Sequence, residues 1–350
     1  MDILILLLAF VVILMGAELF TNGIEWFGRK LELAEGAVGS VLAAVGTALP
    51  ETMIPIIAIL FASGEASSGV GIGAILGAPF MLATLAMFVT GLAVLAVAGR
   101  RSSNDEMRVD TQVLAHDMRY FAIAYAIAIG AAFLSLEPVW LKWIVALVLI
   151  GIYGWYVKGH FEADPTVNLD DLAPLRFHRL DRTAHREDPA APRLRVVNLQ
   201  VLAALGLIVI GAVFFVDAVE HLATNLGIDG VLLALVIAPI ATELPEKFNS
   251  VIWVRQGKDT LAMGNITGAM VFQSTIPTVV ALVFASDHWM VGPGSYTAFA
   301  SAGIAFLSSA FIFIPMARRG VLRGRGLLVG GLFYLAYLAL VIVVVSGALG

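Results

Sequence analysis

The sequence predicts an all-α membrane protein whose ten transmembrane helices form two inverted repeats of five. Three observations lead to this fold class. Apolar residues make up 60% of the 350 residues and charged residues 13%, whereas soluble domains average about 45–50% apolar and about 25% charged. The apolar residues fall into ten long runs, and the two halves of the chain share motifs at a constant spacing. This composition excludes an ordinary water-soluble enzyme, and the lack of cysteine excludes disulfides and Cys-ligated metal centres.

The ten apolar runs give the predicted helices in order. A spanning helix needs about 20 mostly apolar residues, and helices are expected because lipid cannot satisfy exposed backbone groups. The first run begins at Ile3 without a preceding positive segment, so it does not have the form of a secretory signal. The runs are 3–17 with a continuation after Glu18, 36–62, 69–98, 119–136, 139–157, 199–225, 230–254, 260–285, 295–317 and 327–348. They divide the chain into a first five-helix repeat at 1–157, a cytoplasmic loop at 158–197 and a second five-helix repeat at 198–350.

The loop at 158–197 and the basic residues fix the expected orientation. The loop holds fourteen Asp, Glu, Lys and Arg residues and four prolines, and we expect it to be a flexible tether. In a ten-helix arrangement, nineteen of the 21 Lys and Arg residues lie on the side of this loop. The positive-inside rule makes that side cytoplasmic and places both termini outside. We therefore expect a multi-pass protein of a prokaryotic plasma membrane. Of the other two cations, Lys142 lies beside Trp140 and Trp143 in what we interpret as an interfacial belt, and Lys247 lies inside the seventh helix.

The two halves of the chain resemble each other at an offset of 195 residues. Matching positions are Gly16 and Gly211, Glu25 and Glu220, Thr47 and Thr242, and Leu49–Glu51 and Leu244–Glu246. Because each half holds an odd number of helices, the second half enters the membrane from the opposite face. An inverted repeat with interrupted helices is typical of secondary transporters, whose substrate site lies at the repeat interface near the midplane.

Two carboxylates lie at the centre of this repeat. Glu51 and Glu246 are each in the middle of an apolar run, where an ionisable residue is costly and indicates function by default. Each follows a proline, which removes a backbone donor and is expected to break the helix and release the carbonyls of Gly46 and Ala241. Carboxylate, Thr hydroxyl and carbonyl oxygens suit a hard cation such as calcium. A kinked helix with a neutral, hydrogen-bonded Glu is the alternative, and the symmetrical recurrence of the motif disfavours it.

Both segments resemble a known motif. Gly46–Glu51 and Ala241–Glu246 are similar to the paired alpha-repeat motifs of the sodium/calcium exchangers, in the calcium:cation antiporter superfamily, whose pattern is Gly-Ser/Thr-Ser-x-Pro-Glu/Asp. The resemblance implies the exchanger fold and alternating-access antiport of calcium, or another divalent cation, against protons or sodium. It implies no enzymatic activity and no cofactor. The candidate ligands are Glu51, Glu246, Thr47, Thr242, Glu243, Asn265 and Gln273.

The chain departs from the family pattern in ways that bear on the counter-ion. The middle Ser of the motif is Ala48 in one half and Glu243 in the other. The third helix lacks the polar side chains that the family carries there, and the eighth keeps only Asn265 and Gln273. Coupling to several sodium ions is therefore less favoured than coupling to protons, which need only titratable groups. With no divalent cation bound, we expect at least one of the three pocket acids to hold a proton.

Lys247 follows Glu246 directly, and its role stays open at this point. Adjacent residues of a helix point about 100° apart, so Lys247 either faces another helix and pairs with a membrane acid, or reaches the pocket and replaces a cation. The membrane acids outside the motifs are Glu18, Glu25, Asp217 and Glu220. We interpret these as interfacial or vestibule carboxylates, with a cation funnel or proton relay as the alternative. The three motif acids and Lys247 carry a net charge of −2, which one divalent cation or two protons would neutralise.

Other functional classes have less support. The six histidines lie in expected loops or near helix ends and do not form a site, and no Walker motif is present. A passive cation channel, a sodium/proton exchanger of the same fold and an intramembrane protease remain as alternatives. The expected partners are membrane lipid and small inorganic cations and not nucleic acid; a monomer is one oligomeric state among those that the sequence leaves open.

Overall fold

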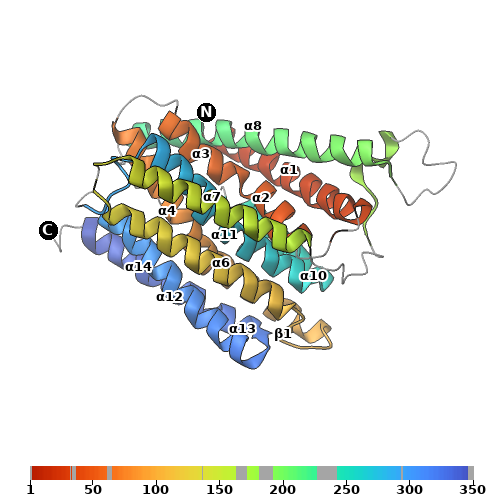
Figure 1. Cartoon of the computed structure of the whole chain (residues 1–350). Coiled ribbons are helices and arrows are strands. Elements are labelled where there is room, and N and C mark those ends of the chain that lie inside the picture. Colours follow the sequence, from red (N-terminus) through yellow and green to blue (C-terminus); the bar gives the residue numbers. More distant parts are fainter. Residues whose placement is uncertain are drawn as a thin grey trace.

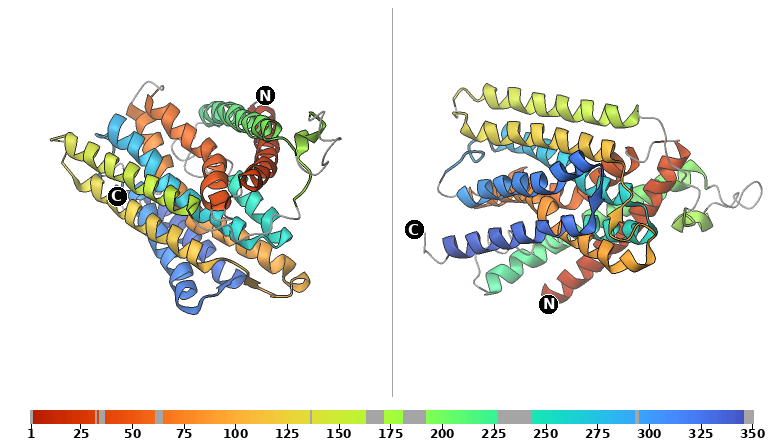
Figure 2. Two further views of the ribbon diagram at one scale, coloured as in Figure 1. Left: turned by 45° about the vertical axis from the view of Figure 1, so that its right-hand side comes forward. Right: turned by 90° about the horizontal axis from the view of Figure 1, so that it is seen from below.

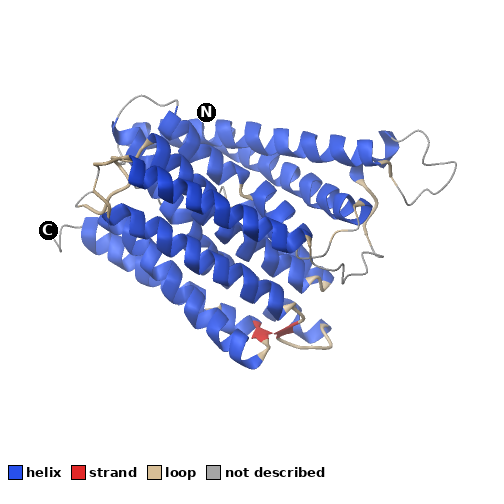
Figure 3. Ribbon diagram, in the orientation of Figure 1, coloured by secondary structure: helices blue, strands red, loops and turns tan. Residues whose placement is uncertain are grey.

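The computed structural model is a helical bundle (Figures 1 and 3) that describes residues 2–31, 33, 37–60, 65–135, 137–162, 172–180, 192–226, 243–292 and 295–345. The α-helices are α1 (Asp2–Lys30), α2 (Ala44–Thr47), α3 (Leu49–Leu60), α4 (Glu65–Met81), α5 (Met87–Val97), α6 (Thr111–Gly130), α7 (Trp140–Phe161), α8 (Leu194–Leu226), α10 (Leu244–Gln256), α11 (Asp259–Phe284), α12 (Tyr296–Arg319), α13 (Gly324–Leu327) and α14 (Val329–Val345). Two π-helical stretches, η1 (Ala37–Ala43) and η2 (Leu82–Ala86), and three 3₁₀ turns, η3 (Ala98–Arg100), η4 (Ala131–Phe133) and η5 (Arg176–Leu180), complete the helical elements. Strands β1 (Glu106–Met107) and β2 (Leu322–Arg323) pair antiparallel, with Glu106 opposite Arg323.

The predicted apolar runs correspond to these helices. Nine of the ten runs coincide with described helices, and the run 230–254 is described only from residue 243. Seven of the described helices are long and apolar enough to cross a membrane. Large apolar side chains such as Phe133, Leu147 and Leu332 are exposed on the outside of the bundle. An apolar outer surface of this kind is favourable in lipid and unfavourable in water. The chain is therefore a multi-pass membrane protein.

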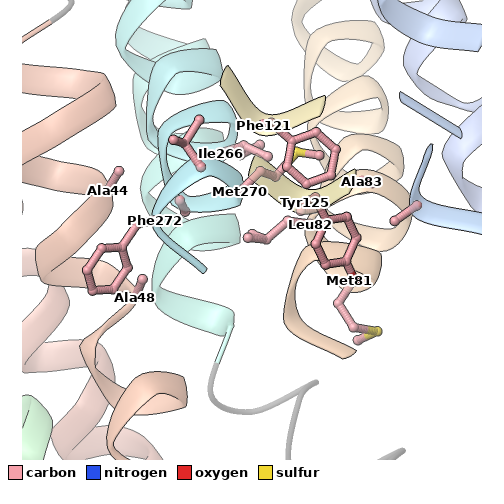
Figure 4. Close-up of a cluster of buried hydrophobic side chains, with 14 of the residues drawn as sticks. Ala44, Ala48, Met81, Leu82, Ala83, Phe121, Tyr125, Ile266, Met270 and Phe272 are labelled. Carbon is pink, nitrogen blue, oxygen red and sulfur yellow. The ribbon is translucent and has the colours of Figure 1, made fainter. Parts of the chain in front are cut away.

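Helix α11 forms the centre of the bundle. It is buried over most of its length, and it packs against α6, α7, α10, η1 and α4. Its polar side chains, such as Asn265, Thr267 and Gln273, are buried as well, so they face other helices and not lipid. Phe121 and Tyr125 of α6 pack with Met270 and Ile266 of α11 in one continuous apolar cluster (Figure 4). At Gly268 the backbone of η1 comes so close that a Cβ would lie 2.0 Å from the Ser40 carbonyl oxygen.

Helices α1 and α8 lie side by side at the edge of the bundle (Figure 2). A Cβ on Gly16 would lie 2.8 Å from Ile208 Cγ1, and a Cβ on Gly211 would lie 2.7 Å from Ile13 Cγ1. The two contacts are equivalent, because Gly16 and Gly211, like Ile13 and Ile208, occupy matching positions of the repeat. The two helices therefore cross antiparallel at a point where both backbones need a residue without a side chain.

Part of the 158–197 loop is docked against this helix pair, so the expectation of a flexible tether is wrong for residues 172–180. Trp26 Nε1 donates to the Ala173 carbonyl at 2.9 Å, and the Arg176 N–H donates to Asn22 Oδ1 at 3.0 Å. Leu175 is buried with Trp26 and Val197. An apolar side chain within the polar segment thus anchors it to α1 and α8.

Lys142 is buried against protein, although its expected place in an interfacial belt stays a prediction. Trp140 and Trp143 are exposed, but the Lys142 side chain is buried. Its ammonium donates to the carbonyls of Ser286 and Trp289. Lys142 therefore satisfies backbone oxygens beyond the end of α11, where no further helical N–H is available to them.

We expect Gly211→Val to destabilise the protein because the new side chain would overlap Ile13 where α1 crosses α8. Overpacking of this kind costs about 1–3 kcal/mol, and the melting temperature of the purified protein in detergent measures it. Gly206→Val on the same helix is the matched control, since no heavy atom of the described structure lies within 4 Å of a Cβ there. Equal melting temperatures for the two variants would contradict the close crossing.

Candidate cation-binding site

The second predicted helix is interrupted immediately before Glu51. Helix α2 ends at Thr47, Ala48 forms a turn, and α3 begins at Leu49. Pro50, in the first turn of α3, has no N–H to donate to the Gly46 carbonyl, which accounts for the break. The interruption expected from the sequence is therefore confirmed in the first half. It places Glu51 in the first turn of α3, at the positive end of the helix dipole.

The second half repeats this arrangement as far as it is described. Glu243 is the N-cap of α10, Pro245 lies in the first turn, and Glu246 follows it. Thr242 and the Ala241 carbonyl lie outside the described residues, so their expected roles stay predictions. Both motif helices contact α11, which brings the two carboxylates to the centre of the bundle.

The carboxyl groups of Glu51 and Glu246 are buried without partners. The two residues are 6% and 0% exposed, and none of their four carboxyl oxygens has a hydrogen-bond partner among the described residues. Glu51 is also close enough to interact electrostatically with both Glu246 and Glu243. Buried carboxylates without donors are strongly unfavourable unless a cation or a proton compensates them. The two carboxyl groups are also close enough to hydrogen-bond to each other when one of them is protonated, so the site accommodates either a shared proton or a cation.

Asn265 connects the two halves of the site. Its Oδ1 lies 3.1 Å from the Thr47 hydroxyl, and its Nδ2 donates to the Glu246 carbonyl oxygen at 3.4 Å. The Thr47 hydroxyl is also 3.0 Å from the Ala43 carbonyl oxygen. Among the described residues no three Asp, Glu, His or Cys side chains converge on one metal position. A cation held by Glu51 and Glu246 would therefore need hydroxyl, amide or carbonyl oxygens such as these to complete its shell.

Gln273 braces the interruption from α11. Its Nε2 donates to the Ala48 carbonyl at 3.2 Å and lies 3.1 Å from the Thr52 hydroxyl. The amide nitrogen thus satisfies the turn that separates α2 from α3. A direct contact between Gln273 and the transported ion stays a prediction.

Lys247 pairs with Glu243 of its own helix. Its ammonium lies 2.9 Å from Glu243 Oε2, and both residues are buried. The other acids that the sequence offered are engaged elsewhere or outside the described side chains. Glu25 pairs with Lys258 and accepts a bond from Trp253, Glu18 pairs with Arg176, and the side chains of Asp217 and Glu220 are not described. Glu243 Oε1 keeps no partner among the described residues.

A further buried acid, Asp117 of α6, was not predicted from the sequence. Its carboxylate accepts from Ser40 Oγ at 2.8 Å, from Thr267 Oγ1 at 2.5 Å and from the Tyr156 hydroxyl at 3.0 Å. His160 Nε2 is 2.8 Å away. Ser40 and Thr267 belong to η1 and α11, so Asp117 ties together two elements that carry the site.

His160 lies in the last turn of α7 and not in the expected loop. It is 4% exposed and pairs with Asp117. Tyr156 and His160 are four residues apart, which puts them on one face of α7. The spacing of Tyr156 and His160, together with the single aspartate in α6, is the sequence signal that could have predicted the contact between His160 and Asp117.

We expect Asp117→Ala to destabilise the protein strongly because it leaves three hydroxyl groups and His160 without their acceptor. Each buried donor left without an acceptor costs about 1–3 kcal/mol, whereas Tyr156→Phe removes only the hydroxyl that contacts Asp117 and the Ser40 carbonyl and costs about 0.5–1.5 kcal/mol. Thermal unfolding in detergent measures both. Glu106→Ala is the control, since its pairing with Arg323 at 3.9 Å is exposed. An Asp117→Ala variant that melts with Glu106→Ala would refute this role.

Comparison with known proteins identifies relatives of this chain by sequence and by fold. The family model described as "Sodium/calcium exchanger protein" matches residues 1–159 and 197–346. The "Putative antiporter CaxA" of Alkalimonas amylolytica is 24% identical over 309 residues, covering 87% of this chain and 88% of that protein. A solved structure of the sodium-calcium exchanger NCX_Mj superposes with a TM-score of 0.69 at 18% identity, covering 97% of each chain. The crystal structure of the H+/Ca2+ exchanger CAX gives a TM-score of 0.72 at 17% identity, covering 96% of this chain and 82% of that one.

Proposed function

We infer that this chain, which belongs to the sodium/calcium exchanger protein family, moves calcium across the membrane in exchange for protons. The family is one of transporters, and the structure shares the fold of exchangers that differ in their counter-ion. Cation antiport is therefore the general activity. The transported cation and the counter-ion are argued from the site itself.

The observation that supports a divalent cation is the pair of partnerless carboxylates. Glu51 and Glu246 bring four buried oxygens without hydrogen-bond partners among the described residues, and they come from opposite halves of the repeat. Two carboxylates with nearby neutral oxygens suit a hard divalent ion, and a flexible shell of six to eight oxygens favours calcium over magnesium. The names of NCX_Mj and CAX as calcium exchangers agree with this assignment.

The neutral oxygens around the site favour protons as the counter-ion. Sodium needs several neutral oxygens to replace its hydration shell, but α4 presents only apolar residues from Gly71 to Met81. The amide nitrogens of Asn265 and Gln273 donate to the two motif segments, so these side chains offer one amide oxygen each, fewer than the several neutral oxygens that sodium needs. Protons need only the carboxylates. Calcium and protons then compete for Glu51 and Glu246, and this competition couples the two fluxes.

Alternating access follows from the separation of the bundle into two parts. The site is built on α2, α3, α10 and α11, whereas α1 and α8 form a pair at the edge (Figure 2). We propose that this pair slides across the site and exposes it to each side in turn. The concentration of Lys and Arg on one side of the ten-helix arrangement orients that side towards the cytoplasm of a prokaryotic cell, with both termini outside.

We expect Glu51→Gln and Glu246→Gln each to abolish calcium transport while the protein still folds. Each change keeps the shape of the side chain and removes one charged ligand. Uptake of ⁴⁵Ca²⁺ into proteoliposomes measures transport, and gel filtration checks the fold. Glu18→Gln is the control acid on α1, because its pairing with Arg176 is exposed. Full transport by both single variants would rule out the site.

Calcium uptake should be driven by a pH gradient in sodium-free buffer. Protons in an acidic lumen displace calcium from the two carboxylates on the lumenal side. Calcium uptake should therefore rise with lumenal acidity and fall when the outside is acidified. An outward sodium gradient at equal pH is the comparison. Exchange also separates a carrier from a channel, because unlabelled lumenal calcium accelerates labelled uptake only in a carrier. Flux that requires sodium and ignores the pH gradient would contradict proton coupling.

A further inference from the structure

Lys247 is a positive charge inside a site that attracts cations. It is 5% exposed, follows Glu246 directly, and holds Glu243 Oε2 at 2.9 Å across one turn of α10. The proposed antiport mechanism assigns no role to Lys247. A buried ammonium has a large desolvation cost, and its pairing with a carboxylate offsets that cost only if the geometry is favourable. The close contact meets that condition.

The pair sets the net charge of the site. Glu51 interacts electrostatically with both Glu246 and Glu243, so the three acids share one environment. Lys247 offsets one of their three negative charges and leaves −2. Glu18 and Glu25 are paired with Arg176 and Lys258 and do not change this count. One divalent cation, or two monovalent cations, neutralises the remainder.

The Lys247–Glu243 ion pair keeps the net charge of the site constant through the transport cycle. Lys247, Glu243 and Glu246 lie on the same helix, and the ion pair joins residues one turn apart. A rearrangement that slides α1 and α8 past α10 leaves the pair intact. The ammonium is therefore a cation that cannot leave with the transported ions.

We propose that Lys247 acts as a tethered cation that fixes the exchange at one divalent ion for two monovalent ions, so that transport moves no net charge. This inference rests on the proposed antiport but does not depend on whether the counter-ion is a proton or sodium. It makes Lys247 a stoichiometry-determining residue. A purely structural lysine would affect stability and leave the charge moved per cycle unchanged.

The test is the steady-state calcium ratio across proteoliposomes whose membrane potential is clamped with potassium and valinomycin. If one net charge moved per cycle, 100 mV would change this ratio about 50-fold. The wild-type ratio should stay the same at 0 and 100 mV. Lys247→Met should make the ratio depend on the potential or stop transport, because the site then carries −3. Lys247→Arg keeps the positive charge, so the site stays at −2 and the ratio should stay independent of the potential.

The outcomes separate this inference from the proposed function. Wild-type exchange whose calcium ratio follows the potential overturns the inference and leaves antiport standing. A Lys247→Met variant whose calcium ratio does not depend on the potential overturns it as well, as does a Lys247→Arg variant that is inactive or whose ratio follows the potential. Absence of any divalent exchange by the wild-type protein would instead remove the proposed function, and the inference with it.

Discussion

The burial of negative charge at the centre of a membrane is the constraint on which the rest of the structure depends. Glu51 and Glu246 are enclosed by the bundle, and their carboxyl oxygens have no donors among the described residues. Such a site is stable only when a proton or a metal ion compensates the charge. In the proposed antiport the site is always loaded, and what loads it depends on the concentrations on the side to which it is open. Exchange is then the direct consequence of this requirement.

Several features hold the two carboxylates in place without neutralising them. A proline lies in the first turn of the helix that carries each acid, and Asn265 and Gln273 of α11 bond to the two motif segments. Between these two residues on α11, Thr267 shares the Asp117 carboxylate with Ser40. These bonds satisfy backbone and hydroxyl groups that would otherwise be exposed in a low-dielectric interior. The acids themselves remain available to ions.

The parts of this arrangement that follow a local pattern were predictable from the sequence. Apolar runs predict the helices, and a Pro-Glu pair inside an apolar run predicts both the interruption and the buried acid. Contacts between distant segments have no such pattern. Asp117 precedes its apolar run and resembles a loop residue until α6 places it against His160, and Leu175 resembles a loop residue until it meets Trp26. Lys247 had several acids within reach of its long side chain, and only the structure selects Glu243.

The central claim is that calcium and protons compete for the same two carboxylates. Calorimetric titration of the purified protein with calcium, repeated in buffers of different ionisation enthalpy, measures the number of calcium ions bound and protons released together. If calcium and protons compete, one calcium ion binds per chain and protons are released on binding. Up to two protons are released at acidic pH, and fewer as the pH rises. Calcium binding that releases no protons at any pH, or that persists in a Glu51→Gln/Glu246→Gln double variant, would contradict it.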